Sequence, residues 1–595
     1  MKKQTKLVAV LSTAALLAIG ASMTSFAATG WAEEDGTWVY YNRDGERATD
    51  SWKKSGNNWY YLDSDGEMAI DQLIEDGDNY YYVDINGVMA SNQWVAIENE
   101  DAGEDDEPEH YWYYFQANGK ALTNGDNDKV SLKTINGKKY AFDDEGKMLY
   151  GWVDEDSAER VDDTDSDGFK EGVYYFGGED DGAMTTGWLQ LDITYDEATN
   201  DDYKYTAAAF NDDEDQTRWF YFKSNGKKIF AEDGDRTKDK TINGKKYAFD
   251  QYGAMVAEWS LDEDDLGTNP NAFTSNVASS AEVITGKAFD SKYTESWKYF
   301  NSVEDGARVS KGWFKVVPAE YLNEDKYNDD EDFWYYADGS GNLYAGEFKT
   351  IKGKKYAFRN DGRMINGLKF IKEGTNDFED VIADDDDNHS FDNEDDFLAQ
   401  ASTYFEGEGY KCYYFGGDED GAMRTGKTSL TFDGENTNFY FEKSGGKKGA
   451  GVTGEKDNKL YQSGMLLKAD SDDKYTVVDK ETHTKAGGTK YVTYTKLDDA
   501  KAFMDSVKNH GGKVNDELAG KEGSTKVTVG SNTTKKAEDL AEAYSVELKD
   551  VKNHEYILVN TSGKVIDSKG KNKDGSDYYY VTDSNGKITN IYVED

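Results

Sequence analysis

The sequence predicts an all-β fold, an elongated solenoid of stacked β-hairpin repeats with acidic loop insertions and a small α/β segment near the C-terminus. Three observations predict it. The segment TINGKKYAFDDEGKMLYGW, which begins at Thr134, recurs with changes from Thr241 and from Thr350. The 595 residues include 43 Tyr and 13 Trp, so the apolar surface is aromatic rather than aliphatic. With 59 Gly and only 3 Pro, the chain is rich in the short turns of repetitive β proteins.

The first residues have the pattern of an export signal. Lys2, Lys3 and Lys6 precede the apolar run LVAVLSTAALLAIG, and small residues follow up to Ala27. The apolar run is too short to span a bilayer comfortably. We therefore expect a signal peptide over 1–27 and no transmembrane segment after its removal. The single cysteine, Cys412, allows no intramolecular disulfide and is expected to be a buried apolar residue of a repeat strand.

Each repeat reads as a β-hairpin. NNWYYLDSDGEMA has a short aromatic run, a polar turn ending in Gly and a second short run. Strand alternation places Trp59 and Tyr61 on one side and Tyr60 and Leu62 on the other, so both faces are apolar. Since one hairpin cannot bury two faces, neighbours must stack on each other, which predicts the solenoid. Equivalent turns end at Gly87, Gly119, Gly146, Gly226, Gly362 and Gly586.

Repeat boundaries divide the mature chain into four parts. Residues 30–100 are N-terminal hairpins, and 110–468 are duplicated hairpins separated by acidic inserts, with related blocks at Trp112, Trp219, Trp334 and Phe439. Residues 469–553 form the small α/β segment, and 554–595 are C-terminal hairpins. In the α/β segment, helical spacing predicts helices over 497–512, with a stop at His510, and over 535–551. Residues 490–497 read as a strand.

Charge limits the partners. With 118 Asp and Glu against 68 Lys and Arg, the formal net charge is −50, which argues against binding nucleic acid or an anionic membrane face. Asp163, Asp165 and Asp167 alternate as in a calcium loop, but Tyr174 stands where an EF-hand needs Glu. We expect no cofactor other than calcium at this loop, for which a solvated acidic loop is the alternative. The five histidines show no metal-ligand spacing.

The order G-W, polar spacer, W-Y-Y, Gly turn, x-M and G-W resembles the cell-wall-binding repeat of choline-binding surface proteins of Gram-positive bacteria. The TINGKKYAF version also resembles the carbohydrate-binding repeats of large clostridial toxins and of glucan-binding proteins. The likeness runs from Gly30 to about Met465 and returns weakly near the C-terminus. It implies a hairpin solenoid whose ligands bind at junctions between neighbouring hairpins.

In the choline-binding branch, the resemblance implies aromatic cages for a quaternary ammonium group, which aromatic faces hold well. The matching positions are Trp31, Trp38, Trp52, Trp59, Tyr61, Trp152, Trp188, Trp219, Trp297, Trp313 and Trp334. A place in the hydrophobic core is the alternative for any one of them. The TINGKKYAF hairpins have Lys where choline repeats tend to have Trp, followed by Tyr140, Tyr247 and Tyr356. For these hairpins we expect packing or sugar stacking rather than a cage.

Three functional classes follow from these features. The first is a secreted, non-catalytic protein associated with the cell wall or cell surface, which binds a choline-bearing wall polymer or a glycan through many aromatic sites. The second is an accessory chain of an amidase-type cell-wall hydrolase, and the third is an adhesin for host glycans. We favour the first and expect no enzyme activity, because no paired nucleophile and base stands out in the sequence. The sequence leaves choline and glycan open as ligands.

Overall fold

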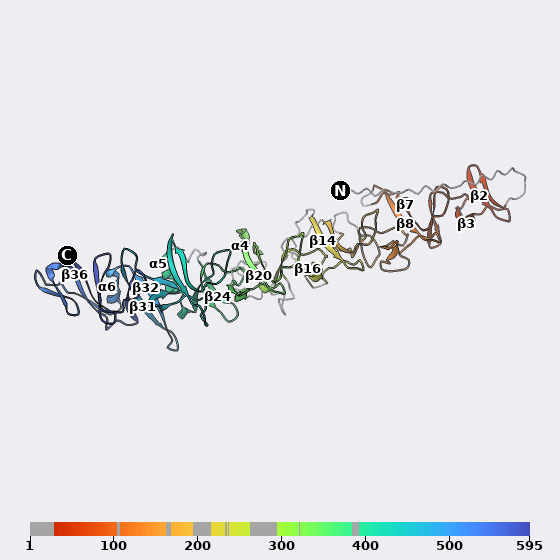
Figure 1. Cartoon of the computed structure of the whole chain (residues 1–595). Coiled ribbons are helices and arrows are strands. Elements are labelled where there is room, and N and C mark those ends of the chain that lie inside the picture. Colours follow the sequence, from red (N-terminus) through yellow and green to blue (C-terminus); the bar gives the residue numbers. More distant parts are fainter. Residues whose placement is uncertain are drawn as a thin grey trace. The chain divides into compact units, whose positions relative to one another are not determined.

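The computed structural model describes residues 29–103, 107–161, 168–193, 216–232, 235, 237–261, 294–319, 322–383, 391, 393–432 and 434–595. The chain divides into two compact units, Met1–Ser260 with Tyr299–Arg308, and Leu261–Lys298 with Val309–Asp595. Both are built mainly from antiparallel strands, in agreement with the all-β prediction (Figure 1). None of the helices in the described ranges is long and apolar enough to cross a membrane.

The first unit is a series of two-stranded hairpins. They are β1 (Gly30–Glu34) with β2 (Thr37–Tyr41), β3 (Ser51–Ser55) with β4 (Asn58–Leu62), β5 (Gln72–Asp76) with β6 (Asn79–Val83), β7 (Gln93–Glu98) with β8 (His110–Phe115), β9 (Lys133–Ile135) with β10 (Lys138–Tyr140), β11 (Trp152–Val153) with β12 (Tyr174–Tyr175), β13 (Gly187–Ile193) with β14 (Gln216–Phe222), and β15 (Lys238–Ile242) with β16 (Lys245–Phe249). The strands β17 (Glu258–Leu261) and β18 (Trp297–Phe300), which contain residues of both units, follow in the chain.

The second unit begins with the same type of hairpin and then builds larger sheets. Its elements up to residue 467 are β19 (Gly312–Val316), α4 (Glu324–Asn328), β20 (Phe333–Ala337), β21 (Phe348–Ile351), β22 (Lys354–Ala357), β23 (Leu368–Glu373), β24 (Phe378–Ile382), α5 (Glu394–Thr403), η2 (Glu406–Glu408), β25 (Tyr410–Tyr414), β26 (Gly426–Phe432), β27 (Glu435–Phe441), β28 (Gly454–Lys456), β29 (Lys459–Gln462) and β30 (Met465–Leu467). The helix α5 arises from an insert that reads as acidic loop. Its N-cap is Asn393, whose side chain accepts the Asp396 amide, and the helix buries Phe397 against Phe439 at 5.3 Å.

Aspartate and glycine together shape the hairpin turns. In the turn after β4, the Asp63 carboxylate accepts the amides of Asp65 and Glu67, each at 2.9 Å. The Asp63 carbonyl accepts the amide of Gly66 at 3.0 Å, and Gly66 has φ +75°. Short polar side chains favour such turns, and the last position needs a residue that tolerates positive φ. The turns that start at Asp84, Asp250, Asp338 and Asp583 have the same side-chain bonds.

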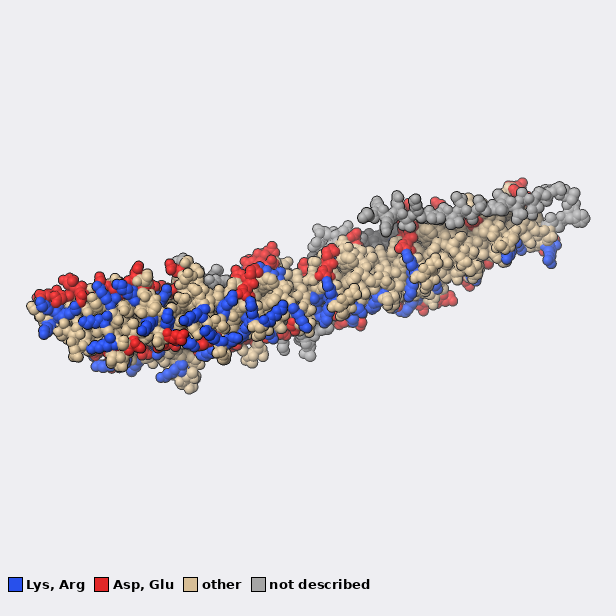
Figure 2. Space-filling view, viewed as in Figure 1, with Lys and Arg blue, Asp and Glu red and all other residues tan. Residues whose placement is uncertain are grey.

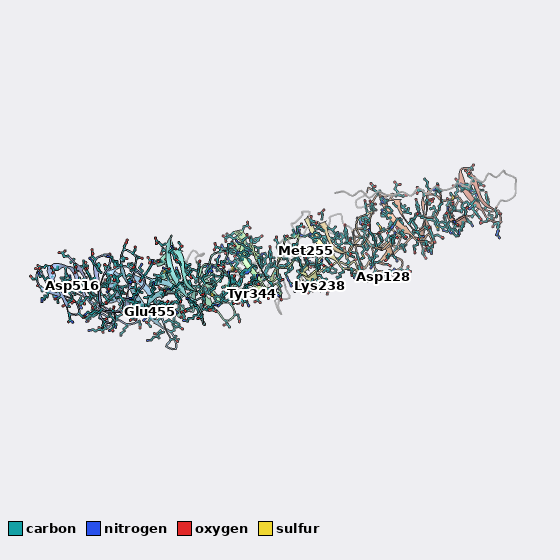
Figure 3. The ribbon with its side chains drawn as sticks, in the orientation of Figure 1. Asp128, Lys238, Met255, Tyr344, Glu455 and Asp516 are labelled. Atoms are coloured by element: carbon teal, nitrogen blue, oxygen red, sulfur yellow. The ribbon has the colours of Figure 1, made fainter. Side chains whose placement is uncertain are left out.

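In several repeats, the residue two places after the turn glycine joins three successive hairpins. Its amide donates to the preceding hairpin, as from Met148 to the Trp112 carbonyl at 2.7 Å and from Met255 to the Trp219 carbonyl at 2.8 Å. Its side chain packs on the next turn glycine, where a Cβ on Gly182 would lie 2.3 Å from the Met148 sulfur. We call this arrangement the methionine ladder. Its methionines are Met68, Met89, Met148, Met184, Met255, Met364 and Met423; Met255 is labelled in Figure 3.

Acidic and basic side chains intermix on the visible surface of each unit (Figure 2). Several carboxylates therefore have a basic neighbour, as where Lys227 Nζ lies 2.5 Å from Glu155 and Lys480 Nζ lies 2.8 Å from Glu555. Such exposed pairs contribute little to stability, but they lower local repulsion in a chain of formal net charge −50.

Residues after 469 form a compact mixed region. A three-stranded sheet has β31 (Tyr475–Thr484) between β32 (Lys490–Leu497) and β37 (His554–Asn560), and α6 (Ala500–Asn509) lies beside it (Figure 1). A five-stranded sheet has the order β33 (Lys513–Asp516), β36 (Leu540–Glu547), β40 (Ile588–Glu594), β39 (Tyr578–Thr582) and β38 (Gly570–Lys573). The hairpin β34 (Lys526–Gly530) with β35 (Thr533–Lys536) and the turn η3 (Ala537–Asp539) complete it. Strands before and after residue 553 thus share sheets.

The prediction of α6 and of strand 490–497 is confirmed, but the helix predicted over 535–551 is wrong. That segment forms η3 and then the strand β36. Leu540, Ala543 and Val546 are buried at a spacing of three, which imitates a helix. A bulge between Leu540 and Glu542 and burial of both strand faces produce this spacing in a strand.

Candidate functional site: three equivalent aromatic clusters

Three sets of five aromatic side chains have the same arrangement and the same origin in the hairpins. Cluster 1 is Trp94, Trp112, Tyr114, Tyr140 and Phe142. Cluster 2 is Trp188, Trp219, Tyr221, Tyr247 and Phe249. Cluster 3 is Trp313, Trp334, Tyr336, Tyr356 and Phe358.

Each cluster is formed by two neighbouring hairpins. In cluster 2, the antiparallel register of β13 and β14 places Trp188 opposite Tyr221 and Gln190 opposite Trp219. Both tryptophans therefore lie on the same side of this hairpin. The next hairpin, β15–β16, adds Tyr247 and the fully buried Phe249. Thus the TINGKKYAF hairpins supply the third wall of each cluster.

The ring geometry repeats closely. The centroids of the two indoles lie 6.5, 6.2 and 6.3 Å apart in clusters 1, 2 and 3, with interplanar angles of 82°, 89° and 87°. The tyrosine of the second hairpin lies 4.9, 4.8 and 4.8 Å from the first tryptophan. Both tryptophans of every cluster are partly exposed, while Tyr140, Tyr247 and Tyr356 are buried to 9%, 8% and 8% exposure. The two indole faces thus stand at about a right angle to each other, and both are open to a ligand from solvent.

A carboxylate from a third hairpin accepts a hydrogen bond at each cluster. Trp112 Nε1 donates to Asp180 at 3.1 Å, Trp219 Nε1 to Glu304 at 3.4 Å, and Trp334 Nε1 to Glu419 at 2.9 Å. Each acid stands two places before a turn glycine on the methionine ladder. The side chains of Asp180 and Glu419 are 71% and 67% exposed. The carboxylates thus place negative charge at the solvent rim of the aromatic rings.

The second neighbour of the carboxylate differs between clusters. His110 Nε2 lies 3.1 Å from Asp180, Gln190 Nε2 donates to Glu304 at 3.4 Å, and Lys315 Nζ donates to Glu419 at 2.7 Å. The bonds from Lys315 and Trp334 lower the pKa of Glu419, and the bond to Glu419 raises the pKa of Lys315. The third cluster therefore has an internal cation beside its carboxylate, and the neutral Gln190 stands at the corresponding position of the second cluster.

The N-terminal hairpins hold partial versions of this arrangement. Trp52 lies 5.1 Å from Tyr61 and 5.0 Å from Tyr81 of the next hairpin. Trp59 is 40% exposed and has Lys54 Nζ 5.8 Å from its ring. In the three clusters, the acid stands two places before the turn glycine on which the methionine packs. The corresponding residue for this hairpin is Ala117, which has no carboxylate.

Trp31 and Trp38 belong to the first hairpin. Trp31 contacts Tyr40 at 5.4 Å and Tyr60 at 5.3 Å. Trp38 lies opposite Glu33 and is partly buried. The turn position that provides the carboxylate in the three clusters is Ile85 for this hairpin.

Two of the predicted tryptophans lie in the interior. Trp152 is 3% exposed and packs against Tyr175, Phe220 and Phe222. Trp297 is 1% exposed. We leave both out of the candidate site, since a ligand from solvent cannot reach them without displacing core side chains.

The ring of Trp152 already faces a cation of the chain itself. Lys228 Nζ lies 5.0 Å from the Trp152 ring and donates to the Phe169 carbonyl. Lys228 stands at a methionine-ladder position and is 2% exposed. Burial lowers the pKa of Lys228 to about 7, and burial raises the pKa of Asp250 to about 6.

Sequence reasoning finds both tryptophans of clusters 2 and 3 but misses Trp94 and Trp112. The resemblance depends on the G-W pair, and Gln93 precedes Trp94. The WYY run beginning at Trp112 is a usable signal, because it is the counterpart of Trp219 and Trp334. The proposed calcium ligands Asp163, Asp165 and Asp167 lie outside the described residues.

Comparison with known proteins supports the likeness. Residues 48–94 match the choline-binding repeat family, and this range holds β3 to β6 with Trp52, Tyr61 and Tyr81. Glucosyltransferase-S of Streptococcus mutans serotype c is 25% identical over 285 residues, which cover 43% of this chain and 16% of the glucosyltransferase.

Solved structures from Streptococcus pneumoniae also align. The modular autolysin LytC is 19% identical with a TM-score of 0.27, over 57% of this chain and 54% of LytC. Choline binding protein F is 15% identical with a TM-score of 0.21, over 74% of this chain and 98% of that protein. The chain thus spans about half of the autolysin and a smaller part of the glucosyltransferase. Within residues 48–94 it matches the choline-binding repeat, as the resemblance of its hairpins implies.

Proposed function

We propose that this chain is a non-catalytic cell-wall-binding surface protein that holds quaternary ammonium groups of a choline-bearing polymer at the three aromatic clusters and at Trp52. The observation that carries the proposal is the threefold recurrence of two perpendicular indoles and a tyrosine with a carboxylate at the rim. The match of residues 48–94 to the choline-binding repeat supports it.

The chemistry of the clusters favours a cation that donates no hydrogen bonds. Aromatic faces attract such a cation electrostatically, with about 0.5 to 2 kcal/mol per contact. The rim carboxylate adds Coulomb attraction for a positive charge, whereas a neutral sugar can only donate hydroxyl hydrogen bonds to it. A single site of this type binds at about the millimolar level, which corresponds to about 4 kcal/mol. Several sites on one chain raise the avidity for a polymer by about 10²–10⁴.

The direct experiment is titration of the mature chain with choline, tetramethylammonium and N-acetylglucosamine, followed by tryptophan fluorescence. We expect both ammonium compounds to change the fluorescence at millimolar concentration and the sugar to have no effect. Trp219→Ala should remove the share of the signal that comes from cluster 2 and weaken binding to choline-bearing walls. Trp219→Phe keeps an aromatic face and should lose less. A response to the sugar alone would favour the carbohydrate-binding branch of the resemblance and contradict the proposal.

The rim carboxylates allow a sharper prediction. A unit charge about 4 Å from the ligand is worth about 1 kcal/mol in water. Glu304→Gln should therefore weaken choline binding at cluster 2 about fivefold, because Gln190 beside it is neutral. Glu419→Gln should have a smaller effect, because Lys315 already pairs with that carboxylate. Lys315→Gln should strengthen binding at cluster 3.

Isothermal titration with choline at low salt checks these differences, and high salt should diminish them. Unchanged choline binding in Glu304→Gln would show that the rim charge has no role in binding. In that case the carboxylates only hold the indoles in place.

The alternative of a wall hydrolase has its own test. Zymography of the mature chain on choline-bearing walls should give no cleared band if the chain is non-catalytic. A cleared band at its mass would contradict that part of the proposal. The host-glycan alternative predicts retention on host glycans that free choline does not compete away.

A further inference from the structure

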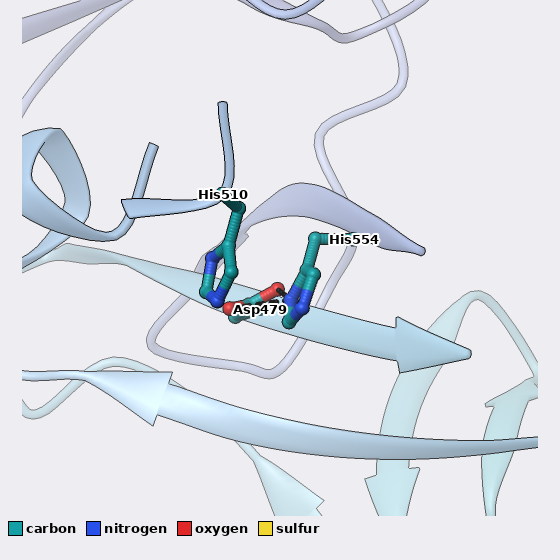
Figure 4. Close-up of side chains that lie close together, drawn as sticks. All are labelled: Asp479, His510 and His554. Atoms are coloured by element: carbon teal, nitrogen blue, oxygen red, sulfur yellow. Dashed lines mark hydrogen bonds and ion pairs between the residues drawn. The ribbon is translucent and has the colours of Figure 1, made fainter. Parts of the chain in front are cut away.

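We propose that Asp479, His510 and His554 form a binding site for a divalent transition metal ion of the zinc class. The three side chains come from separate parts of the chain, and their potential ligand atoms all lie within 4.8 Å of one another. Figure 4 shows the two imidazoles beside the Asp479 carboxylate. This inference is independent of the proposed function.

The sheet and helix together force these residues to converge. Asp479 lies on the central strand β31 opposite Tyr556 of β37, and His554 precedes Tyr556 by two residues. All three therefore project from the same face of the sheet. The helix α6 lies against that face, where Phe503 contacts Tyr556 at 5.1 Å. His510 caps the end of α6, four residues after Ser506.

The hydrogen bonds around the cluster orient it as second-sphere partners orient metal ligands. His510 Nδ1 lies 3.2 Å from the Tyr556 hydroxyl and 3.3 Å from the Ser506 hydroxyl, and Ser506 also donates to Asp479 at 3.2 Å. These contacts engage Nδ1, so the other ring nitrogen of His510 is the one available to a metal. In metal sites the second nitrogen of a histidine ligand usually donates to a carboxylate, a backbone carbonyl or water, and here the two hydroxyl groups take that place.

Charge and burial favour a cation at this position. Asp479 is 8% exposed as a residue and stands in the middle of a sheet, where an ionised carboxylate is costly without a positive partner. His554 Nδ1 lies 3.0 Å from one oxygen of Asp479 and 3.1 Å from the other. The rings of His510 and His554 stack at 3.5 Å. Two imidazoles and a carboxylate are together a donor set for one metal ion.

The kind of ligand atoms and the distances between them indicate which class of metal ion fits the site. Two imidazole nitrogens and one carboxylate suit zinc, cobalt or nickel better than calcium or magnesium, which prefer oxygen ligands. A zinc ion lies about 2.0 to 2.1 Å from each nitrogen, so two of its ligand atoms are at most about 4.2 Å apart. The ligand atoms lie within 4.8 Å of one another, and the two imidazole planes are 12° from parallel, so binding requires both histidine rings to turn toward a common ion. Three protein ligands leave a further coordination position for water or another ligand.

The test is metal binding by the full mature chain after treatment with a chelator. Titration with Zn²⁺ in excess Ca²⁺, which occupies the surface carboxylates, should give one tight equivalent. Substitution with Co²⁺ should produce visible absorption of a site with nitrogen ligands. His510→Gln and His554→Gln should each weaken Zn²⁺ binding by at least about 100-fold, and Ser506→Ala by about tenfold.

His483→Gln is the matched control, because His483 lies on the same strand β31 and contacts Thr493 instead. It should leave Zn²⁺ binding unchanged. The absence of a tight zinc equivalent, or equal loss in His483→Gln and His554→Gln, would overturn the proposal and leave a histidine–aspartate ion pair. If a variant fails to fold, the cobalt spectrum of the unaltered chain decides between these outcomes.

Discussion

Gly226→Ala should destabilise the first unit by about 2 to 5 kcal/mol. Gly226 has φ +88°, and a Cβ there would lie 2.3 Å from the sulfur of Met184. Positive φ costs an alanine about 1 to 2 kcal/mol, and forcing a methyl group into a packed contact costs about 1 to 3 kcal/mol more. The methionine ladder repeats this contact between successive hairpins. A side chain at the turn glycine is therefore excluded both by the positive φ and by the methionine of the neighbouring hairpin.

Gly244→Ala provides the matched control within the same unit. Gly244 has φ +83°, but a Cβ at this position would have no atom within 4 Å. This variant should lose only the cost of positive φ. The difference between the two variants therefore measures the contact with Met184.

Guanidinium denaturation measures the change in stability. Because the chain has more than one unit, hydrogen exchange of the amides in 216–232 is needed to assign the unfolding transition to this part of the chain. Adding Met184→Ala to Gly226→Ala should recover about 1 to 3 kcal/mol relative to the sum of the single changes. Equal destabilisation by Gly226→Ala and Gly244→Ala would mean that Met184 moves aside freely.

The hairpins can be predicted from the sequence because their signals are local. The run from Asn57 to Ala69 contains both strands and the turn, and the Asp63 side chain and Gly66 act within that turn. The x-M pattern is visible as well. That Met68 packs on Gly87 is not predictable, because the contact depends on how one hairpin stacks on the next.

The candidate sites are predictable only where the residues of one hairpin are sufficient. Trp188 and Trp219 follow from a single hairpin signature, while the sequence assigns Tyr247 to packing or sugar stacking. The place of Tyr247 in cluster 2 depends on the neighbouring hairpin, which the sequence does not place in space. His510 and His554 belong to different kinds of element, since His510 ends a helix and His554 starts a strand, and no local pattern in the sequence links them. Pairing of β31 with β37 places His554 beside Asp479, and the packing of α6 on this sheet brings His510 to them.

Lys228→Met should stabilise the first unit by about 1 to 4 kcal/mol at neutral pH. Replacement of a whole buried ion pair by apolar side chains often stabilises by about this amount, and burial of the Lys228 ammonium group carries the same desolvation cost. Methionine is the residue at seven equivalent ladder positions, and the aliphatic part of Lys228 already packs on Gly253 as methionine does on other turn glycines. Asp250 keeps its bonds from the amides of Tyr252 and Ala254, each at 2.9 Å, so it is not left without partners.

The pH dependence identifies the cause. Burial lowers the pKa of Lys228 from its ordinary value of 10.5 to about 7 in the folded chain. Between these values the unfolded chain binds a proton that the folded chain does not, so stability of the unaltered protein rises with pH in this window. Lys228→Met removes that rise, and its advantage should therefore be largest near pH 7 and fade as pH approaches 10.

Lys227→Met is the control, because Lys227 is the adjacent residue and its ion pair with Glu155 is partly exposed. Its effect should stay within about 0.5 kcal/mol. Denaturation midpoints of the three proteins at several pH values between 7 and 10 check both statements. A loss of stability in Lys228→Met that is the same at every pH would show that the bond to the Phe169 carbonyl and the contact with Trp152 outweigh the cost of burying the ammonium group. The Lys228 ammonium group would then stabilise this hairpin through its contacts with Trp152 and Phe169, at the position where other repeats have methionine.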